Sequence, residues 1–346
     1  MGEGPTLAEL GEWELIRRLG AFAPPGQFAD DGALLRLGGD PSLVVNTDVL
    51  VEGLHFSDAT TEAADVGWRA AVANLSDLAA MGCTEVVGLT VGLVAPPSTR
   101  WTWVEGVYGG LAGALARYGG VLLGGDCSGG AQRLLAITAI GRLAPLPQQE
   151  QAGPIRRSDG RPGDRLVSSG PHGLSRLGLA LLLAPDGPLA AQADPELRER
   201  AIQAHRRPRA RLDVARALIT CRPTATPWRV GGCDSSDGLA AAVAAIAAAS
   251  GCGARLDRAA LPMDPAMAAF TEAEAWCLGG GEDFELVLAL EPRWAAALVA
   301  AQRGSGVIGE LVEGKAGELR WGGAGAGKEP DPRGDAIAVS GYRHFG

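Results

Sequence analysis

The chain has 346 residues, 47% of them apolar, which is enough for two domains with a substantial core. Aspartate and glutamate number 40 against 31 lysines and arginines, so the formal net charge is −9. This balance excludes a generally basic nucleic-acid-binding protein. No apolar run reaches the roughly 20 residues of a membrane-spanning helix. The six cysteines form no C-x-x-C pair and no secretion signal is visible, so we expect a cytoplasmic protein.

Apolar periodicity predicts alternating strands and helices in the first half of the chain. Strands are predicted over residues 43–46, 85–94, 121–124 and 133–142, and helices over 62–81 and 101–118. A polar stretch rich in proline and glycine follows over 144–163 and indicates a boundary. We therefore expect an N-terminal domain over 1–145 and a C-terminal domain over 150–346.

The second half repeats the same style. Strands are predicted over 165–169, 229–233 and 284–290, and helices over 174–184, 207–220, 238–250 and 292–302. The tail over 314–334 resembles a loop, with a short strand at 318–321. The mixture of strands and helices predicts an α/β or α+β fold.

Two glycine-rich motifs imitate nucleotide-binding loops. Residues 322–328 spell most of a Walker A loop, but Glu329 stands where Ser or Thr binds Mg²⁺, and two nearby prolines forbid the helix that should follow. Residues 304–309 match G-x-G-x-x-G, but they follow a predicted helix and enter a strand, the reverse of a dinucleotide-binding turn. The second motif is typical of a helix end with a left-handed glycine.

Acidic residues recur beside glycines and at the ends of the predicted elements. They are Asp30, Asp31, Asp48, Asp77, Asp126, Asp234, Asp237, Glu282 and Asp283. Each alone has an ordinary explanation: a turn, a cap by Asp234 or Ser236 on the helix near Gly238, or a solvated position for Asp77. Together they indicate one site, and converging carboxylates repel each other unless cations lie between them.

Mg²⁺ is the natural cation for such a site, because it takes oxygen ligands and bridges carboxylates to substrate phosphates. Neighbouring glycines let backbone N–H groups approach phosphate oxygens. The pattern therefore indicates phosphoryl transfer. The basic run 205–211 is more typical of a solvated or interface surface than of a catalytic group.

Ten motifs, in order along the whole chain, carry a family resemblance. They are GEWELIRRL (11–19), DDGALL (30–35), NTDVLVEGLHF (46–56), NLSDLAAMG (74–82), GGD (124–126), RPGD (161–164), HRRPRARLD (205–213), DSSDGL (234–239), GGGEDFELVL (279–288) and GYRHF (341–345). The chain resembles the thiamine-monophosphate kinases, within the superfamily of aminoimidazole ribonucleotide synthetase-like ATP-binding enzymes.

The resemblance implies a two-domain α/β (α+β) fold, in which the N-terminal domain forms an intersubunit β-barrel in a homodimer and a C-terminal α/β domain packs against it. It also implies the reaction. ATP and thiamine monophosphate give ADP and thiamine diphosphate, the last step of thiamine diphosphate biosynthesis, by direct in-line transfer assisted by several Mg²⁺ ions. No nucleic-acid or membrane partner is expected.

Carried onto matching positions, the resemblance implies three sets of site residues. The metal ligands are Asp31, Thr47, Asp48, Asp77, Asp126, Asp234 and Asp237. The ATP contacts are Tyr108, Gly125, Asp126, Arg157 and Ser236. The thiamine-phosphate contacts are His55, Glu282 and Tyr342. No catalytic side chain distinct from the metal ligands is expected, because the acceptor phosphate is already ionised at neutral pH.

The sequence departs from the family pattern in places, and three different functions stay open. Asn46 stands where the family often has Ser or Thr, Cys127 where Thr is common, and residues 173–175 read Gly-Leu-Ser instead of Gly-Asp-Ser. The first open function is that of another enzyme of the superfamily; selenophosphate synthetase is disfavoured because no cysteine precedes Asp30. The second is nucleotide or cation binding without turnover, and the third is that of a structural subunit.

Overall fold

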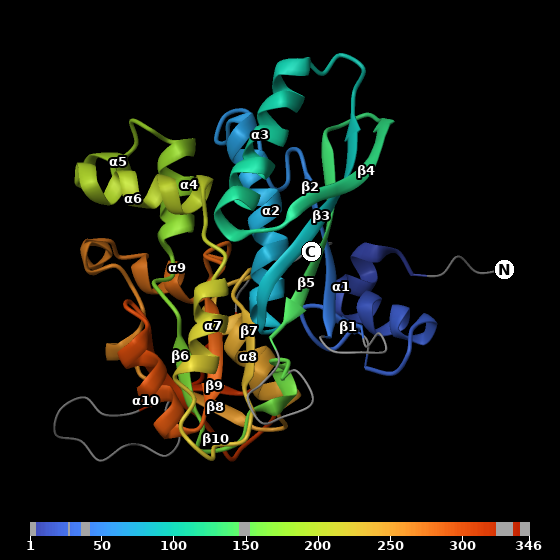
Figure 1. Ribbon diagram of the computed structural model, residues 1–346. Coiled ribbons are helices and arrows are strands. Elements are labelled where there is room, and N and C mark those ends of the chain that lie inside the picture. The colour runs from blue at the N-terminus through green and yellow to red at the C-terminus, as the bar shows by residue number, and fades with distance from the viewer. Residues whose placement is uncertain (1–4, 27, 36–41, 145–152, 323–334, 340–346) are drawn as a thin grey trace.

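The structure is a computed structural model that describes residues 5–26, 28–35, 42–144, 153–322 and 335–339. Two β-sheets, one from each half of the chain, form the framework, and helices cover them (Figure 1). The predicted two-domain α/β fold is confirmed in this respect. The domain limits of 1–145 and 150–346 stay a prediction.

The first sheet has five strands in the order β1-β2-β5-β3-β4. They are β1 (Ala33–Leu35), β2 (Leu43–Val51), β3 (Cys83–Ala95), β4 (Val121–Gly129) and β5 (Leu134–Leu143). All neighbouring pairs are antiparallel except β3 and β4. Within the described residues the sheet is open, with β1 and β4 at its edges, and it does not close into a barrel.

Two long helices, α2 (Ala63–Ala80) and α3 (Trp101–Tyr118), pack together beside this sheet (Figure 1). Glycines permit their close approach. A Cβ atom at Gly67 would lie 1.9 Å from the carbonyl oxygen of Val107, and one at Gly110 would lie 1.9 Å from that of Ala64. Residues of β5 alternate between buried and half-buried, as expected for a sheet that is covered on one face.

The second sheet has six strands in the order β11-β8-β10-β6-β9-β7. They are β6 (Arg165–Ser168), β7 (Gly231–Asp234), β8 (Gly253–Leu256), β9 (Leu286–Leu290), β10 (Gly306–Val312) and β11 (Leu319–Trp321). The helices of this half are α4 (Leu174–Leu183), α5 (Pro188–Gln192), α6 (Pro195–Arg206), α7 (Leu212–Thr220), α8 (Leu239–Ala249), α9 (Ala273–Gly279) and α10 (Pro292–Ala301).

One hydrophobic core joins the two halves. Buried side chains of α2 such as Leu75 belong to the same cluster as Leu212 of α7 and Leu288 of β9. The halves therefore share their core instead of meeting at a polar interface, and α2 lies at the junction.

Several predicted elements change at their ends. The helix predicted over 207–220 begins only at Leu212, because residues 207–211 connect α6 to α7. The helices α1 (Leu7–Leu19), α5, α6 and α9 and the strands β1 and β8 were not predicted as elements. The G-x-G-x-x-G segment joins α10 to β10, and Gly304 has φ +90°, as predicted. Most of the Walker-like segment, 323–328, lies outside the described residues. Within the described ranges, no helix has the length and apolar character needed to cross a bilayer.

Candidate active site

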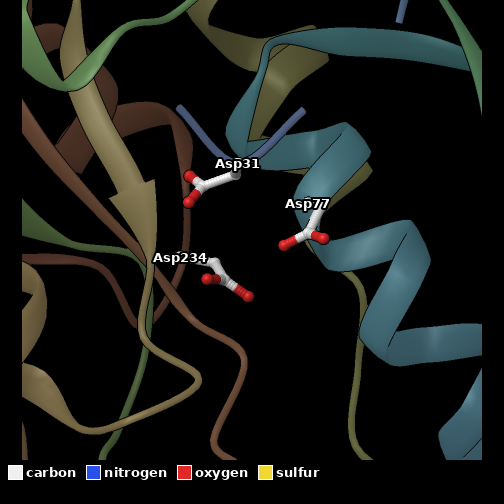
Figure 2. Close-up of side chains that lie close together, drawn as sticks. All are labelled: Asp31, Asp77 and Asp234. Carbon is white, nitrogen blue, oxygen red and sulfur yellow. The ribbon is translucent and has the colours of Figure 1, made fainter. Parts of the chain in front are cut away.

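Three carboxylates from distant parts of the sequence meet between the two sheets. Asp31 lies in the turn before β1, Asp77 in the last turn of α2, and Asp234 at the end of β7. One carboxylate oxygen of each lies within 4.8 Å of the other two (Figure 2). The convergence predicted from the sequence is confirmed for these three residues.

The three carboxylates line a pocket of about 650 Å³. Asp48, Ser236 and Asp237 line the same pocket, as do Asp30 and Arg157. An apolar wall faces this polar lining and consists of Trp13, Ile16, Leu19 and Phe28. The pocket therefore combines a strongly acidic floor with a surface suited to an organic group.

Amide and hydroxyl groups hold the acidic residues in place. Asn46 Nδ2 donates to Asp77 Oδ2 at 2.7 Å, and the backbone N–H of Asp48 donates to Asn74 Oδ1 at 3.1 Å. Ser76 Oγ donates to Asp234 Oδ2 at 2.7 Å. These bonds tie β2 and β7 to α2, so the helix sets the relative positions of the carboxylates.

The loop after β7 turns sharply because of Gly238, whose φ is +109°. A Cβ there would lie 2.9 Å from the carbonyl oxygen of Leu278. Helix α8 begins at Leu239, and its N-cap position is Gly238. The hypothesis that Asp234 or Ser236 serves as the helix cap is therefore wrong, and Asp237 lines the pocket.

Burial and mutual repulsion raise the pKa values of this cluster. Burial is the larger cause, and neighbouring carboxylates add to it. The pKa of Asp31 rises to about 7, the pKa values of Asp48 and Asp234 rise to about 6, and that of Asp77 rises well above its ordinary value. Asp77 is half-buried in the pocket lining and its Oδ2 accepts a hydrogen bond from Asn46, so the hypothesis of a solvated helix residue is wrong.

The donor set fits a hard divalent cation. Every ligand candidate in the cluster is an oxygen, as Mg²⁺ prefers. Asn46 is only 7% exposed, and its Oδ1 has no hydrogen-bond partner among the described residues. A buried acceptor left unpaired beside three carboxylates is the arrangement that a bound cation satisfies.

The other predicted ligands do not join the three-carboxylate cluster. Thr47 also lines the pocket, but successive side chains of a strand face opposite sides, and the Thr47 hydroxyl lies 2.8 Å from that of Thr138 on β5. Asp126 and Gly125 lie on β4 and do not line the pocket. Three strand spacings separate β2 from β4, about 14 Å, so one chain does not bring Asp126 to Asp48.

Some of the predicted ATP contacts line the pocket and others do not. Ser236 and Arg157 line the pocket, where the Arg157 guanidinium pairs with the carboxylate of Asp31 and the Arg157 backbone N–H donates to Asp30 Oδ1 at 2.9 Å. Tyr108 lies on α3 beside Cys127 of β4, outside the pocket lining.

The predicted thiamine-phosphate contacts His55 and Glu282 meet at Arg69. The Arg69 side chain donates to the backbone oxygen of His55 at 3.4 Å and pairs with the Glu282 carboxylate. The Glu282 backbone N–H donates to the oxygen of Ser236 at 2.6 Å, which links this region to the pocket. Tyr342 lies outside the described residues.

Sequence reasoning missed Ser76 and Arg69. The available signal was a polar or charged residue on an apolar helix: Ser76 is fully buried and Arg69 is 2% exposed. Such residues are rarely buried without a specific partner. The basic run 205–211 bridges to the N-terminal half, since Arg206 donates to the Thr60 oxygen at 3.0 Å and Arg207 to Asp65 at 2.6 Å.

Comparison with known proteins identifies the family. Family models described as AIR synthase related protein, N-terminal domain and C-terminal domain, match residues 29–143 and 161–322. The thiamine-monophosphate kinase of Prochlorococcus marinus is 46% identical over 310 residues, 90% of this chain and 91% of the relative. This chain belongs to the thiamine-monophosphate kinase family. The Synechococcus elongatus member is 46% identical over 318 residues, 91% of this chain and 93% of the relative.

Solved structures agree with this membership. A structure described as AaThiL complexed with AMPPCP and TMP matches with a TM-score of 0.81 and 26% identity, over 99% of this chain and 100% of that chain. The resemblance drawn from the sequence motifs is confirmed, and the membership makes the protein a kinase, a phosphotransferase.

Proposed function

We propose that the protein phosphorylates thiamine monophosphate with ATP and forms thiamine diphosphate, as the last step of thiamine diphosphate biosynthesis. The observation that carries the proposal is the meeting of Asp31, Asp77 and Asp234 in one pocket. Its support from relatives is that family members of 46% identity bear the name thiamine-monophosphate kinase, and that the structure of 0.81 TM-score was solved with AMPPCP and TMP.

Asp31, Asp77 and Asp234 would hold Mg²⁺, and Asp48 and Asp237 add negative charge to the same pocket. Bound there, Mg²⁺ supplies positive charge that neutralises phosphate oxygens. Arg157 and Ser236 line the same pocket, which supports their assignment as nucleotide contacts. The roles of Thr47, Tyr108, Gly125, Asp126 and Tyr342 stay predictions.

The transfer needs no general base from the protein. A phosphate oxygen of the acceptor forms a bond to the γ-phosphorus of ATP while the bond to the β–γ bridging oxygen breaks and ADP leaves. The attacking oxygen is already ionised at neutral pH, so no proton has to be removed. Val51 donates its backbone N–H to His55 Nδ1 at 3.0 Å, which places the proton of the neutral ring on Nε2.

A product assay tests the reaction. Purified protein with ATP and Mg²⁺ receives thiamine monophosphate or, separately, free thiamine. Thiamine diphosphate should form only from the monophosphate, and no phosphate should remain on the protein after incubation with labelled ATP alone. Absence of product from nucleotide-binding protein would refute the proposed reaction, whereas a labelled phosphoprotein would refute direct transfer.

We also propose that two copies associate through the first sheet. Strand β4 is exposed along its whole length, and Val121, Leu122 and Leu123 are 59%, 45% and 47% exposed. An exposed edge strand of this length with apolar side chains is a template for pairing with another chain. A second copy there also offers a route by which Asp126 reaches a metal site that it does not reach within one chain.

A further inference from the structure

Arg69 is a buried arginine whose partners come from three separate segments. It lies on α2, is 2% exposed, and donates to the backbone oxygens of His205 and His55 and to the carboxylate of Glu282. A buried guanidinium is costly unless its donors are satisfied. The two terminal nitrogens of Arg69 have these partners, whereas its Nε has none among the described residues. This one connects the loop after β2, the end of α6 and the turn before β9.

Glu282 depends on this contact for its orientation. Its backbone has φ +57°, a left-handed conformation that costs a non-glycine residue free energy unless its surroundings hold it. Its other carboxylate oxygen lies 3.7 Å from His205 Nδ1. Burial and then Arg69 lower the pKa of His205 to about 3, so the imidazole is neutral and Arg69 supplies positive charge to Glu282.

Helix α2 carries this contact and the metal cluster together. Arg69 precedes Asp77 by eight residues, which corresponds to about 12 Å along a helix axis. The side chain of Glu282 is 34% exposed, so its carboxylate is available to a ligand. The helix therefore places a fixed carboxylate at a set distance from the cation site.

We propose that Arg69 is a positioning residue for the phosphate acceptor. It holds Glu282 so that its carboxylate meets a positively charged or N–H-bearing part of the acceptor molecule, while the acceptor phosphate faces the metal cluster. It also fixes the backbone of His55 beside that phosphate. The inference rests on the proposed function, and it specifies an acceptor that carries a cationic group as well as a phosphate.

The test compares steady-state kinetics of Arg69→Met, Arg69→Lys, Glu282→Gln and the double variant Arg69→Met/Glu282→Gln. Loss of a charged hydrogen bond should raise the KM for thiamine monophosphate about tenfold or more, with the KM for ATP within about twofold. Arg69→Lys should recover part of the loss. The double variant should be no worse than the poorer single variant, because both changes remove the same interaction.

A matched control is Arg207→Met, which breaks another ion pair between the α6 region and α2, to Asp65, without contact to Glu282 or His55. It should lower the melting temperature and leave the KM for thiamine monophosphate unchanged. If Arg69→Met does not fold, Arg69→Lys with Glu282→Gln and their double variant measures the same coupling.

Three outcomes overturn the inference. They are equal increases in both KM values, additive effects in the double variant, and an unchanged KM for thiamine monophosphate in an active Arg69 variant. A wild-type protein that makes no thiamine diphosphate refutes the proposed function and this inference together. If the wild-type protein is active and the Arg69 variants have an unchanged KM for thiamine monophosphate, only the inference is refuted.

Discussion

Three influences act on the carboxylate of Asp77. Burial raises its pKa, the charges of Asp48 and Asp234 raise it further, and the amide of Asn46 lowers it. Burial and the neighbouring charges outweigh the amide, so the pKa of Asp77 is raised. The ionised cluster therefore destabilises the fold when no cation is bound. The Asp77 carboxylate therefore lowers the stability of the metal-free fold, although the proposed reaction requires it.

Asp77→Asn should therefore abolish activity while the fold survives. The variant keeps the shape of the side chain and removes one of the three carboxylates, so turnover should fall about 100-fold or more. The melting temperature of the metal-free protein should not fall. The control is Asp186→Asn at an exposed turn position, which should leave both unchanged. Near-normal turnover of Asp77→Asn would remove this residue from the metal site.

The same cluster predicts a pH dependence. The folded pKa values are raised to about 6 for Asp48 and Asp234 and about 7 for Asp31. A raised folded pKa gives stability that is complete below the unfolded pKa near 4 and is lost as the pH rises through the folded values. Metal-free protein therefore loses the cluster's contribution between about pH 4 and 7.

Buried histidines act in the opposite sense, because burial lowers the pKa of His172 to about 4 and their stability is lost on acidification. The cluster is isolated by comparing wild type with Asp77→Asn in EDTA. The melting temperature of Asp77→Asn minus that of wild type is the quantity to compare. This difference should be larger at pH 8 than at pH 5. A difference that does not change with pH contradicts the assignment. Added Mg²⁺ should stabilise wild type more at pH 8.

At the scale of elements, the close crossing of α2 and α3 is a main packing contact of the first half. It depends on Gly67 and Gly110, where a Cβ atom would overlap backbone carbonyl oxygens. Since α2 carries Asp77 and also touches β7, a change in this crossing moves ligands of the cluster relative to each other.

Gly110→Ala should destabilise the protein by about 1–3 kcal/mol, the usual range for overpacking. The neighbouring Gly109→Ala is the matched control: it lies on the same helix, and among the described residues nothing lies within 4 Å of its added Cβ. That change should be neutral or stabilise by about 0.5–1 kcal/mol through helix propensity. Chemical denaturation measures both, and equal effects would contradict the packing argument.

Elements with a strong apolar period could be predicted from the sequence. The predictions 62–81 and 101–118 match α2 and α3 closely. Helix α3 buries one stripe, and α2 is long, apolar and buried on nearly every face. Helix α6 was not predicted, because only Leu197, Ala201 and His205 are buried along it and its apolar stripe is short. Helix α1 buries none of its residues. It therefore has no buried stripe from which the helix could have been predicted.

The site was predictable only in part. Carboxylates at the ends of elements indicated that Asp31, Asp77 and Asp234 converge, and the structure brings these three together. The position of Asp126 follows from the strand order β2-β5-β3-β4, which spacing along the chain does not reveal. Ser76 and Arg69 act through partners more than 150 residues away in sequence, Asp234 and Glu282, so no local pattern indicated them.

At the scale of the whole molecule, the proposed association of two copies through the exposed strand β4 can be tested by changing one side chain. Leu122→Lys places a charge on this edge and should convert a dimer into monomers. Sedimentation at micromolar concentrations measures the change. Leu183→Lys is the control, because Leu183 is 63% exposed at the end of α4, away from the first sheet. A wild-type monomer, or a Leu122→Lys dimer, would refute association through β4.

The hydrophobic core that the two halves share has a consequence for the nascent chain during translation. The first sheet is complete in sequence at Leu143, but α2 waits for the β7 segment that packs against it and ends at Asp234, about ninety residues later. At translation rates of about 5–20 residues per second, this delay lasts roughly 5–20 s. During that interval the part of the α2 surface that packs on α7 and β7 has no cover from its own chain, so the nascent protein should engage ribosome-associated chaperones before its active site exists.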